Sequence, residues 1–399
     1  MSDAVNSVDP LALAQALIRC CSVTPKDDGA LALLQNQLEA LDFTVKRYQF
    51  GDVGNLYARI GTGVPNFCFA GHTDVVPVGD KDEWDDDPFA GHVRDNQLWG
   101  RGAADMKGAI AAFIAATERY LRHNSLNGSI SLLITGDEEG VAVDGTQRVL
   151  GELAKEGEMI SHCLVGEPSN PKALGDEIKN GRRGSLNGII TVKGQQGHVA
   201  YPEQAQNPIP LLITIINRLY ARLLDAKEPG GVKGFQPSNL EVTSIDVDNP
   251  AHNIIPASAS ARFNIRFNVA HTGAQLCDWI EQEARAAERE HPCVVLLDLS
   301  VMGEAFLTKP GTFTTVLQNA VEEMTGRRPA LTTGGGTSDA RFIKNYAPVA
   351  EFGLTGASMH KVNEHVAVSD IHNLSKIYER VLDLYFKEFE LAKRPIVHS

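Results

Sequence analysis

The feature that most constrains the fold is an alternation of short apolar runs with helical patterns over about the first 180 residues. The runs at 66–72, 129–135 and 161–166 have the length and composition of buried strands. Between them, segment 106–123 is apolar along one face and basic at its end, as is typical of a helix. Strands that alternate with helices form parallel sheets, so the sequence predicts an α/β fold with a doubly wound, mostly parallel sheet.

This pattern changes after about residue 180 and returns at about residue 294. In between, segments such as 258–269 alternate apolar and polar residues, as antiparallel strands with one solvated face do, and two helical patterns lie among them. We therefore expect a discontinuous catalytic domain of residues 1–181 and 294–399, with an α+β domain of residues 182–293 inserted into it.

The charge of the chain excludes some classes of partner. It has 37 Lys+Arg and 50 Asp+Glu, so 37 − 50 gives a net charge of −13, which argues against nucleic acid and against an anionic membrane surface. The longest apolar stretch, 108–116, is far shorter than the roughly 20 residues of a membrane helix. The first residues do not resemble a secretory signal, and six scattered cysteines without a CxxC pair suit a reducing compartment. We expect a cytoplasmic protein.

Three of the predicted strands end in side chains that can bind metal. His72 and Asp74 follow the first, Asp137-Glu138-Glu139 follows the second, and Glu167 follows the third. Ligands of open α/β sheets gather at the carboxyl ends of the strands, so these groups are expected to meet. One carboxylate after a strand is ordinarily a helix cap or a solvated loop residue, but three such ends together favour a metal site.

Two further residues complete the candidate site. Asp105 lies in a glycine-bearing loop before a long helix, where alone it would be an N-cap, and His360 lies near the end of the chain. Oxygen and nitrogen ligands without sulfur suit zinc, cobalt or manganese. Three carboxylates and one hydroxide balance two divalent ions, which favours two metals over one. Because Glu138 and Glu139 are adjacent, one can bind metal while the other acts as a general base on water.

Taken together, these motifs resemble those of the co-catalytic di-zinc amidohydrolases related to aminoacylase and the dimeric exopeptidases. The motifs are, in chain order, HTD (72–74), GRGAADMKG (100–108), TGDEEG (135–140), GEPS (166–169) and MHKVNE (359–364). The resemblance implies two zinc ions, for which cobalt can substitute, and an inserted lid domain used for dimerisation. It also implies a cis peptide bond between Asp105 and Met106.

The same resemblance implies a role for each residue of the site. His72 and Glu167 would hold one zinc, Glu139 and His360 the other, and Asp105 would bridge the two. Glu138 would be the general base. Asp74 would orient the imidazole of His72 through its carboxylate.

Three more motifs resemble one branch of this family, the desuccinylases of bacterial lysine and cell-wall synthesis. They are KNGRRGS (179–185), GQQGHVAYP (194–202) and GGGTSDARF (334–342). This resemblance implies hydrolysis of the succinyl amide of N-succinyl-L,L-2,6-diaminopimelate. It also implies that His198 stabilises the oxyanion in the active site of the neighbouring subunit of a homodimer. At Gly356 the chain departs from the pattern, since some desuccinylases have Asn there; that contact is absent or is made by another residue.

A substrate with three carboxylates needs local basic groups, because a chain with a charge of −13 repels an anion at long range. Arginine pairs bidentately with carboxylates, and neutral groups add hydrogen bonds. The expected substrate-binding residues are Lys179, Arg182, Arg183, Ser185, Tyr201, Asn253, Arg266, Gly336 and Thr337.

Two other interpretations stay open. A related deacylase or exopeptidase, such as acetylornithine deacetylase or a dipeptidase, would use the same ligands, although the paired arginines and TSDARF (337–342) favour the desuccinylase. A non-catalytic zinc-binding protein would not need Glu138. The acidic stretch Glu83–Asp87 is interpreted as a solvated loop near the entrance of the site.

Overall fold

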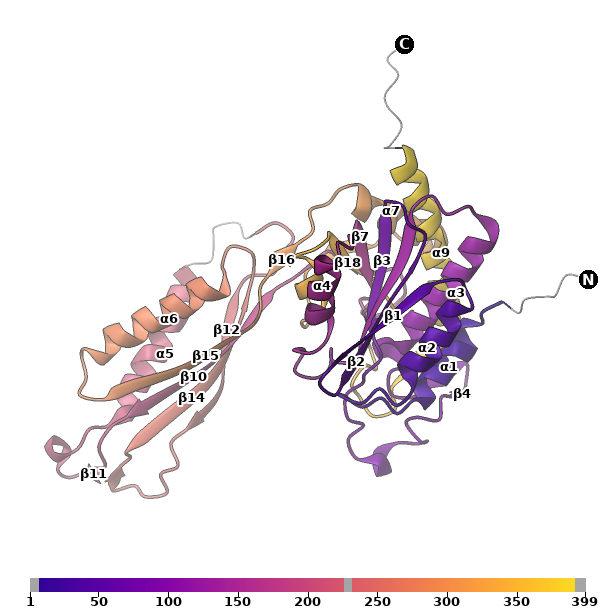
Figure 1. Ribbon diagram of the computed structural model, residues 1–399. Helices are drawn as coiled ribbons and strands as arrows, with labels where there is room; N and C mark the ends of the chain where they lie inside the picture. Colours follow the sequence, from indigo (N-terminus) through magenta and orange to yellow (C-terminus); the bar gives the residue numbers. More distant parts are fainter. Residues whose placement is uncertain (1–6, 226–231, 392–399) are drawn as a thin grey trace, which may run out of the picture. The chain divides into compact units, whose positions relative to one another are not determined.

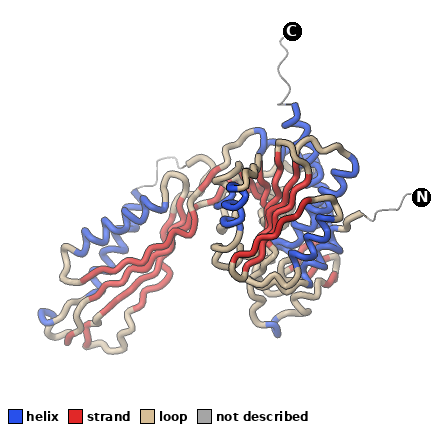
Figure 2. The backbone as a smooth tube through the Cα atoms, in the orientation of Figure 1, coloured by secondary structure: helices blue, strands red, loops and turns tan. Residues whose placement is uncertain are grey.

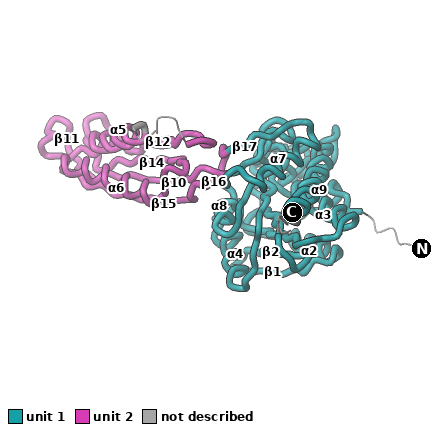
Figure 3. The backbone as a smooth tube through the Cα atoms, turned by 90° about the horizontal axis from the view of Figure 1, so that it is seen from above, with its two compact units in different colours: residues 1–180, 308–332, 338–399 teal, residues 181–307, 333–337 magenta. Residues whose placement is uncertain are grey.

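The chain divides into two compact units, which Figure 3 colours separately. The computed structural model describes residues 7–225 and 232–391 (Figure 1). The expectation that the first residues form no secretory signal concerns in part residues 1–6, which lie outside the described residues. The larger unit contains residues 1–180, 308–332 and 338–399, and the smaller unit contains residues 181–307 and 333–337. Each unit has its own apolar core.

An eight-stranded sheet forms the centre of the larger unit, with the order β1-β2-β6-β3-β7-β18-β8-β17. Neighbouring strands from β6 to β18 are parallel, whereas β1 and β2 at one end, and the pairing of β18 with β8, are antiparallel. The predicted α/β fold with a mostly parallel sheet is confirmed. The strands are β1 (Thr44–Phe50), β2 (Val53–Ile60), β3 (Asn66–His72), β6 (Ser129–Thr135), β7 (His162–Val165), β8 (Glu177–Lys179), β17 (Ala330–Thr332) and β18 (Val349–Glu351).

Helices cover both faces of this sheet (Figures 1 and 2). On one side lie α1, α2, α3 and α9, and on the other lies α4. Asp9 caps α1 by accepting a hydrogen bond from the amide of Leu11, and Pro10 occupies the first turn. No described helix is both long and apolar enough to cross a bilayer. The helices of this unit are α1 (Pro10–Arg19), α2 (Ala30–Glu39), α3 (Gly108–His123), α4 (Thr146–Lys155), α7 (Thr312–Thr325), α8 (Ala340–Ile343) and α9 (Val368–Leu391).

A small three-stranded sheet also belongs to the larger unit, and the sequence did not predict it. It consists of β4 (His92–Arg94), β5 (Gln97–Trp99) and β19 (His365–Ala367). Because His365 pairs with Trp99, the segment before β19 lies against the loop that follows β5. These two loops carry two of the candidate metal ligands.

The smaller unit has an antiparallel sheet with the order β12-β14-β10-β15. Burial alternates along β14, as expected for strands with one face in the core, and α5 and α6 pack on that core. The sheet strands are β10 (Gly184–Lys193), β12 (Asn239–Asp246), β14 (Ser258–Phe267) and β15 (Val294–Gly303); the two-residue strands are β9 (Gly181–Arg182), β11 (Gly197–His198), β13 (Ile254–Ile255) and β16 (Phe306–Leu307); the helices are α5 (Pro208–Asp225) and α6 (Gly273–Glu288).

The inserted unit extends further along the chain than the sequence analysis expected. The boundary at residue 294 rested on segment 294–300, which resembles a strand of the larger sheet. In the structure this segment begins β15, which pairs with β10 of the smaller unit, so the unit runs on to Leu307. An apolar strand is compatible with either sheet, and its own residues do not identify its partner.

Candidate active site

The ligands that follow strands meet at one edge of the larger sheet. β3 is parallel to both β6 and β7, with His72 opposite Thr135 and Ala70 opposite Val165. The chain therefore leaves these three strands at the same edge, which brings together His72, the adjacent pair Glu138 and Glu139, and Glu167.

The other two ligands lie in irregular loops. Asp105 belongs to the π-helical turn Ala103–Lys107, which follows Gly102 with a φ of 88°. The peptide bond from Asp105 to Met106 is cis, which confirms the expectation. His360 has a φ of 61°, in the left-handed region of the backbone. Residues other than glycine rarely adopt this conformation unless neighbouring contacts hold them in it.

Asp105 lies between two histidine–carboxylate pairs. Its Oδ1 is 3.2 Å from Nε2 of His72, and its Oδ2 is 3.2 Å from Nε2 of His360. Nε2 of His72 is also 3.6 Å from Oε1 of Glu167, while Nε2 of His360 is 2.8 Å from Oε1 of Glu139. This is the grouping of five side chains that the family resemblance implies.

The spacing of these donor atoms fits metal ligation. Neighbouring ligand atoms around a tetrahedral zinc ion, with bonds of about 2.0 Å, lie about 3.3 Å apart. The nitrogen–oxygen separations above lie between 2.8 and 3.6 Å. Among the described residues, two overlapping groups bring their ligand-capable atoms within 4.8 Å of one another: His72, Asp105 and Glu139, and His72, Glu138 and Glu167. The nitrogen and oxygen donors therefore fit divalent ions.

Protonation in the metal-free protein points to the same need for cations. Burial, reinforced by the charge of Asp105, raises the pKa of Glu167 well above its usual value, and burial likewise raises the pKa of Glu138. Hydrogen bonds to Asp105 and Glu139 raise the pKa of His360 to about 10. Each of these shifts favours the protonated form, in the direction that reduces the repulsion among crowded carboxylates.

Asp74 contacts His72 mainly through its backbone, and the predicted role of its carboxylate in orienting that imidazole stays a prediction. Nδ1 of His72 donates to the backbone carbonyl of Asp74 at 2.9 Å, whereas the carboxylate is 3.6 Å away. The carboxylate instead accepts hydrogen bonds from the amides of Glu138 at 3.2 Å and Glu139 at 3.0 Å. The carbonyl therefore fixes the tautomer of His72, and the side chain fixes the direction in which the two glutamates leave β6.

One group of expected substrate-binding residues gathers at one end of the smaller unit's sheet. Ser185 pairs with Arg266 across β10 and β14. Burial, followed by the nearby charge of Arg266, lowers the pKa of Arg183. Arg182 donates to the backbone carbonyl of Gly336 at 3.1 Å and so holds the segment that contains Thr337.

A second group lies beyond the opposite end of β10. His198 pairs with Ile254 in the β11–β13 ribbon, the amide of Val199 donates to the carbonyl of Asn253 at 3.1 Å, and the ring of Tyr201 is 5.8 Å from that of His198. A ten-residue strand such as β10 is about 30 Å long. Within one smaller unit, the length of β10 thus separates the two groups by about that distance.

Lys179 belongs to the larger unit. Its ammonium pairs with the carboxylate of Glu177 and donates to Oγ1 of Thr332 at 3.0 Å. The charge of Lys179 is therefore balanced within the protein, which weakens its predicted role in binding a substrate carboxylate.

Sequence reasoning missed two buried charged residues next to the ligands. Arg101 is 2% exposed and Glu364 is 0% exposed, and Nη1 of Arg101 lies 2.8 Å from Oε2 of Glu364. Both residues lie inside motifs that also contain a ligand, GRGAADMKG and MHKVNE. The signal that could have identified Arg101 and Glu364 is that each is a charged residue, without an assigned role, inside a motif that contains a metal ligand.

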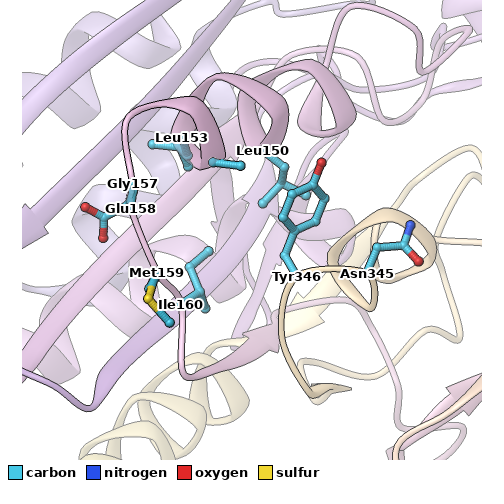
Figure 4. A pocket seen from close by; sticks show the side chains of 9 residues that line it. Leu150, Leu153, Gly157, Glu158, Met159, Ile160, Asn345 and Tyr346 are labelled. Atoms are coloured by element: carbon cyan, nitrogen blue, oxygen red, sulfur yellow. The ribbon is translucent and has the colours of Figure 1, made fainter.

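A separate cavity of about 390 Å³ lies in the larger unit at the end of α4, lined by Leu153, Met159 and Tyr346 among others (Figure 4). Its carboxylate, Glu158, accepts hydrogen bonds from Arg59 and from other residues outside the lining. This largely apolar cavity contains none of the predicted ligands and does not compete with the metal cluster as a candidate active site.

Comparisons with known proteins agree with the motifs. A profile of peptidase family M20/M25/M40 matches residues 68–384. The chain is 62% identical over 389 residues to succinyl-diaminopimelate desuccinylase of Maricaulis maris (97% of this chain and 99% of the relative), and 53% identical over 390 residues to that of Parvibaculum lavamentivorans (96% and 98%).

Two solved structures share the fold. Aminopeptidase PepT from Bacillus cereus has a TM-score of 0.77 at 18% identity and covers 95% of this chain and 98% of its own. A dinuclear metal-binding peptidase of the M20 family from Bacillus subtilis has a TM-score of 0.69 at 14% identity, with the same coverage. From the family match and the relatives, we conclude that the chain belongs to peptidase family M20/M25/M40.

Proposed function

We propose that the protein hydrolyses the succinyl amide of N-succinyl-L,L-2,6-diaminopimelate to succinate and L,L-diaminopimelate, a step of lysine and cell-wall biosynthesis. The observation that carries this proposal is the likeness to succinyl-diaminopimelate desuccinylases over nearly the whole length of both chains. The cluster of five ligand side chains supports it, because hydrolysis of an unactivated amide needs a strongly activated water.

The five ligands are proposed to hold two divalent ions. His72 and Glu167 would bind one ion, Glu139 and His360 the other, and Asp105 both. Their nitrogen and oxygen atoms suit zinc, with cobalt as a substitute. Bound there, the ions would acidify a water molecule and polarise the amide carbonyl.

Glu138 is proposed to carry the proton. It takes a proton from the attacking water and gives it to the amine nitrogen as the C–N bond breaks, so that the carboxylate is regenerated. The hydrogen bonds from the Glu138 and Glu139 amides to Asp74 support this role because they hold Glu138 in one direction. Burial also raises the pKa of Glu138, in the direction that a general base at neutral pH requires.

His198 is proposed to stabilise the oxyanion of the tetrahedral intermediate from a second subunit. The support is the separation of about 30 Å between the His198 and Arg182 groups of one smaller unit, which is longer than the substrate. Both groups can contact one substrate only if they belong to different chains. The protein would therefore act as a homodimer, with the smaller unit as its lid and dimerisation domain.

Recognition of the substrate carboxylates is proposed for the group at the start of β10. Arg183 and Arg266 lie close enough for their charges to interact, which creates a local basic site on an acidic chain. Arg182 contributes indirectly as well, since it holds Gly336 and the following Thr337 in place. We also retain Ser185, Tyr201 and Asn253 as proposed contacts, and Lys179 as a contact that would have to exchange its pairing with Glu177 for the substrate.

A cytoplasmic location is proposed from the chemistry of the cysteines. All six are free, including Cys68 and Cys163, which lie opposite each other on neighbouring strands. Free cysteines persist in a reducing compartment.

Assays on three classes of substrate test the proposed function. The zinc-loaded protein should bind two ions per chain by elemental analysis and should cleave N-succinyl-diaminopimelate with a kcat/KM at least about 100-fold above those for N-acetylornithine and simple dipeptides. Preference for one of the latter would replace the proposal with a related deacylase or exopeptidase. Tight zinc binding without turnover of any substrate would favour a zinc-binding protein, and full activity with one ion would contradict the two-metal site.

A further inference from the structure

We propose that Glu364 is a positioning residue that, together with Arg101, fixes the loops of Asp105 and His360 relative to each other and so allows the second metal position to fill. The inference rests on the metal ligation in the proposed function and deepens it. In this proposal Glu364 binds no metal, because hydrogen-bond donors of the protein already occupy both of its oxygens.

The carboxylate of Glu364 fixes the backbone that leads to the bridging ligand. Its Oε1 accepts hydrogen bonds from the amides of Ala104 at 2.9 Å and Asp105 at 3.2 Å. Its Oε2 accepts from the amide of Gly102 at 3.1 Å and from Nη1 of Arg101 at 2.8 Å. Four donors therefore converge on two oxygens, and one of the donors is the amide of Asp105 itself.

Arg101 connects the same carboxylate to the other ligand segments. Its Nη1 also donates to the carbonyl of Lys361, the residue after His360, at 3.1 Å. Its Nη2 donates to the carbonyl of Pro77, in the segment that follows His72, at 3.4 Å. One buried ion pair thus contacts the backbone at Asp105 and next to His360, and it also contacts the segment that continues from His72.

The chemistry of the pair favours a geometric role over simple stabilisation. Removing two charges from water is costly, and well-packed apolar residues often stabilise a core as well as a buried ion pair does. An ionised carboxylate, however, has two oxygens that only accept hydrogen bonds, which four converging donors require. The amide of glutamine has only one such oxygen. Whichever way the amide is turned, its NH₂ group would face two other donors and could not accept their hydrogen bonds.

The two metal positions should depend on Glu364 to different extents. His72 is the last residue of β3 and Glu167 closely follows β7, so the paired strands hold that position. The other position depends on His360, whose loop is bound to the Asp105 loop through Arg101 and Glu364. Loss of the Glu364 carboxylate should therefore weaken metal binding by Glu139 and His360 more than metal binding by His72 and Glu167.

Cobalt titration of Glu364→Gln tests the inference without using a substrate. Metal-free protein is titrated with Co²⁺ and followed by visible absorption. We expect the second ion to bind about 10- to 100-fold more weakly than in the parent, and the first ion, which shares only Asp105 with it, to lose less affinity than the second. Two ions bound with the affinities of the parent would overturn the proposal.

Glu118→Gln is the matched control. Glu118 is also buried, at 5% exposure, and among the described residues its carboxylate pairs with Arg122 of the same unit and not with a residue of a ligand loop. Its Oε2 has no hydrogen-bond partner among the described residues, so an amide can replace its carboxylate without opposing a donor. This variant should keep both affinities. If Glu118→Gln weakened binding of the second Co²⁺ ion as much as Glu364→Gln does, the loss of affinity would come from general destabilisation of the unit, which would contradict the proposal.

Arg101→Lys provides a second variant if Glu364→Gln does not fold. It keeps the charge, but a single ammonium cannot reach the carbonyls of both Pro77 and Lys361 as well as Glu364. The second ion should again bind more weakly, and affinities equal to those of the parent would overturn the inference. Because the titration uses no substrate, failure of the parent to cleave the succinyl amide would disprove the proposed function alone.

Discussion

At the scale of single residues, the raised pKa values of the site determine how the stability of the protein depends on pH when metal has been removed by chelation. The pKa of His360 is raised to about 10, so the folded chain binds more protons than the unfolded chain above the usual histidine value of about 6.5. A raised pKa means that stability is fully present below the unfolded pKa and is lost as the pH rises through the folded pKa. The raised pKa values of Glu138 and Glu167 act in the same direction.

The Tm of the metal-free protein should therefore fall between pH 6.5 and about pH 10. The gain in Tm on adding zinc should grow over the same range, because the ligands bind metal only when deprotonated. Differential scanning fluorimetry at constant ionic strength measures both effects. His360→Gln should flatten part of the fall. A metal-free Tm that is constant or rises over this range would contradict the explanation.

Glu138→Gln should separate proton transfer from metal binding. The variant keeps all five ligands and should contain as much metal as the parent, but its kcat should fall about 100- to 10,000-fold because the amide cannot accept a proton. Glu139→Gln is the contrasting variant, since it should lose metal by elemental analysis. Normal turnover by Glu138→Gln would exclude Glu138 as the base.

At the scale of elements, the ligands could be predicted from the sequence because most of them follow recognisable apolar strands. Parallel strands that end at one edge bring His72, Glu139 and Glu167 together whatever the details of the loops. The contact between Arg101 and Glu364 could not be predicted in this way. The two residues are 263 positions apart, and the strands that bring their loops together, β5 and β19, are too short for a periodic pattern.

In the loop after β18, the backbone of Gly353 packs closely against the backbone of Gly166 and Glu167, which leaves no room for a side chain at position 353. A Cβ on Gly353 would lie 2.2 Å from the carbonyl oxygen of Gly166 and 2.5 Å from that of Glu167, so the backbone of a ligand would have to move. We expect Gly353→Ala to lower the free energy of unfolding by about 2 kcal/mol or more and to weaken metal binding.

Chemical denaturation and metal titration would test this expectation. Gly151→Ala is the matched control, because Gly151 lies inside α4 and a Cβ there meets no atom within 4 Å. That substitution should instead stabilise the protein by about 0.5–1 kcal/mol. A Gly353→Ala variant as stable as the parent would show that the loop can adapt.

At the scale of the whole molecule, the two separate cores predict that the units respond differently to metal. All five proposed ligands belong to the larger unit, so bound ions should stabilise it directly. For a single site, metal at about 1,000 times its Kd adds about 4 kcal/mol to the free energy of unfolding.

Calorimetry should therefore resolve two transitions, and chelation should lower the temperature of only one. Of the three tryptophans, Trp84 and Trp99 lie in the larger unit and Trp279 in the smaller one. A variant with Trp84→Phe and Trp99→Phe leaves Trp279 as a fluorescent reporter, whose transition should not change on chelation. One transition that shifts as a whole would contradict independent units.

The strand order of the larger sheet also has a consequence for synthesis on the ribosome. β7 lies between β3 and β18, yet β18 is translated only after the whole of the smaller unit's main segment, 181–307. Until then one edge of β7 lacks its partner, and such an edge can pair with other chains. The nascent protein thus completes its inserted unit first and exposes an apolar strand edge meanwhile, which makes it a candidate for protection by chaperones during translation.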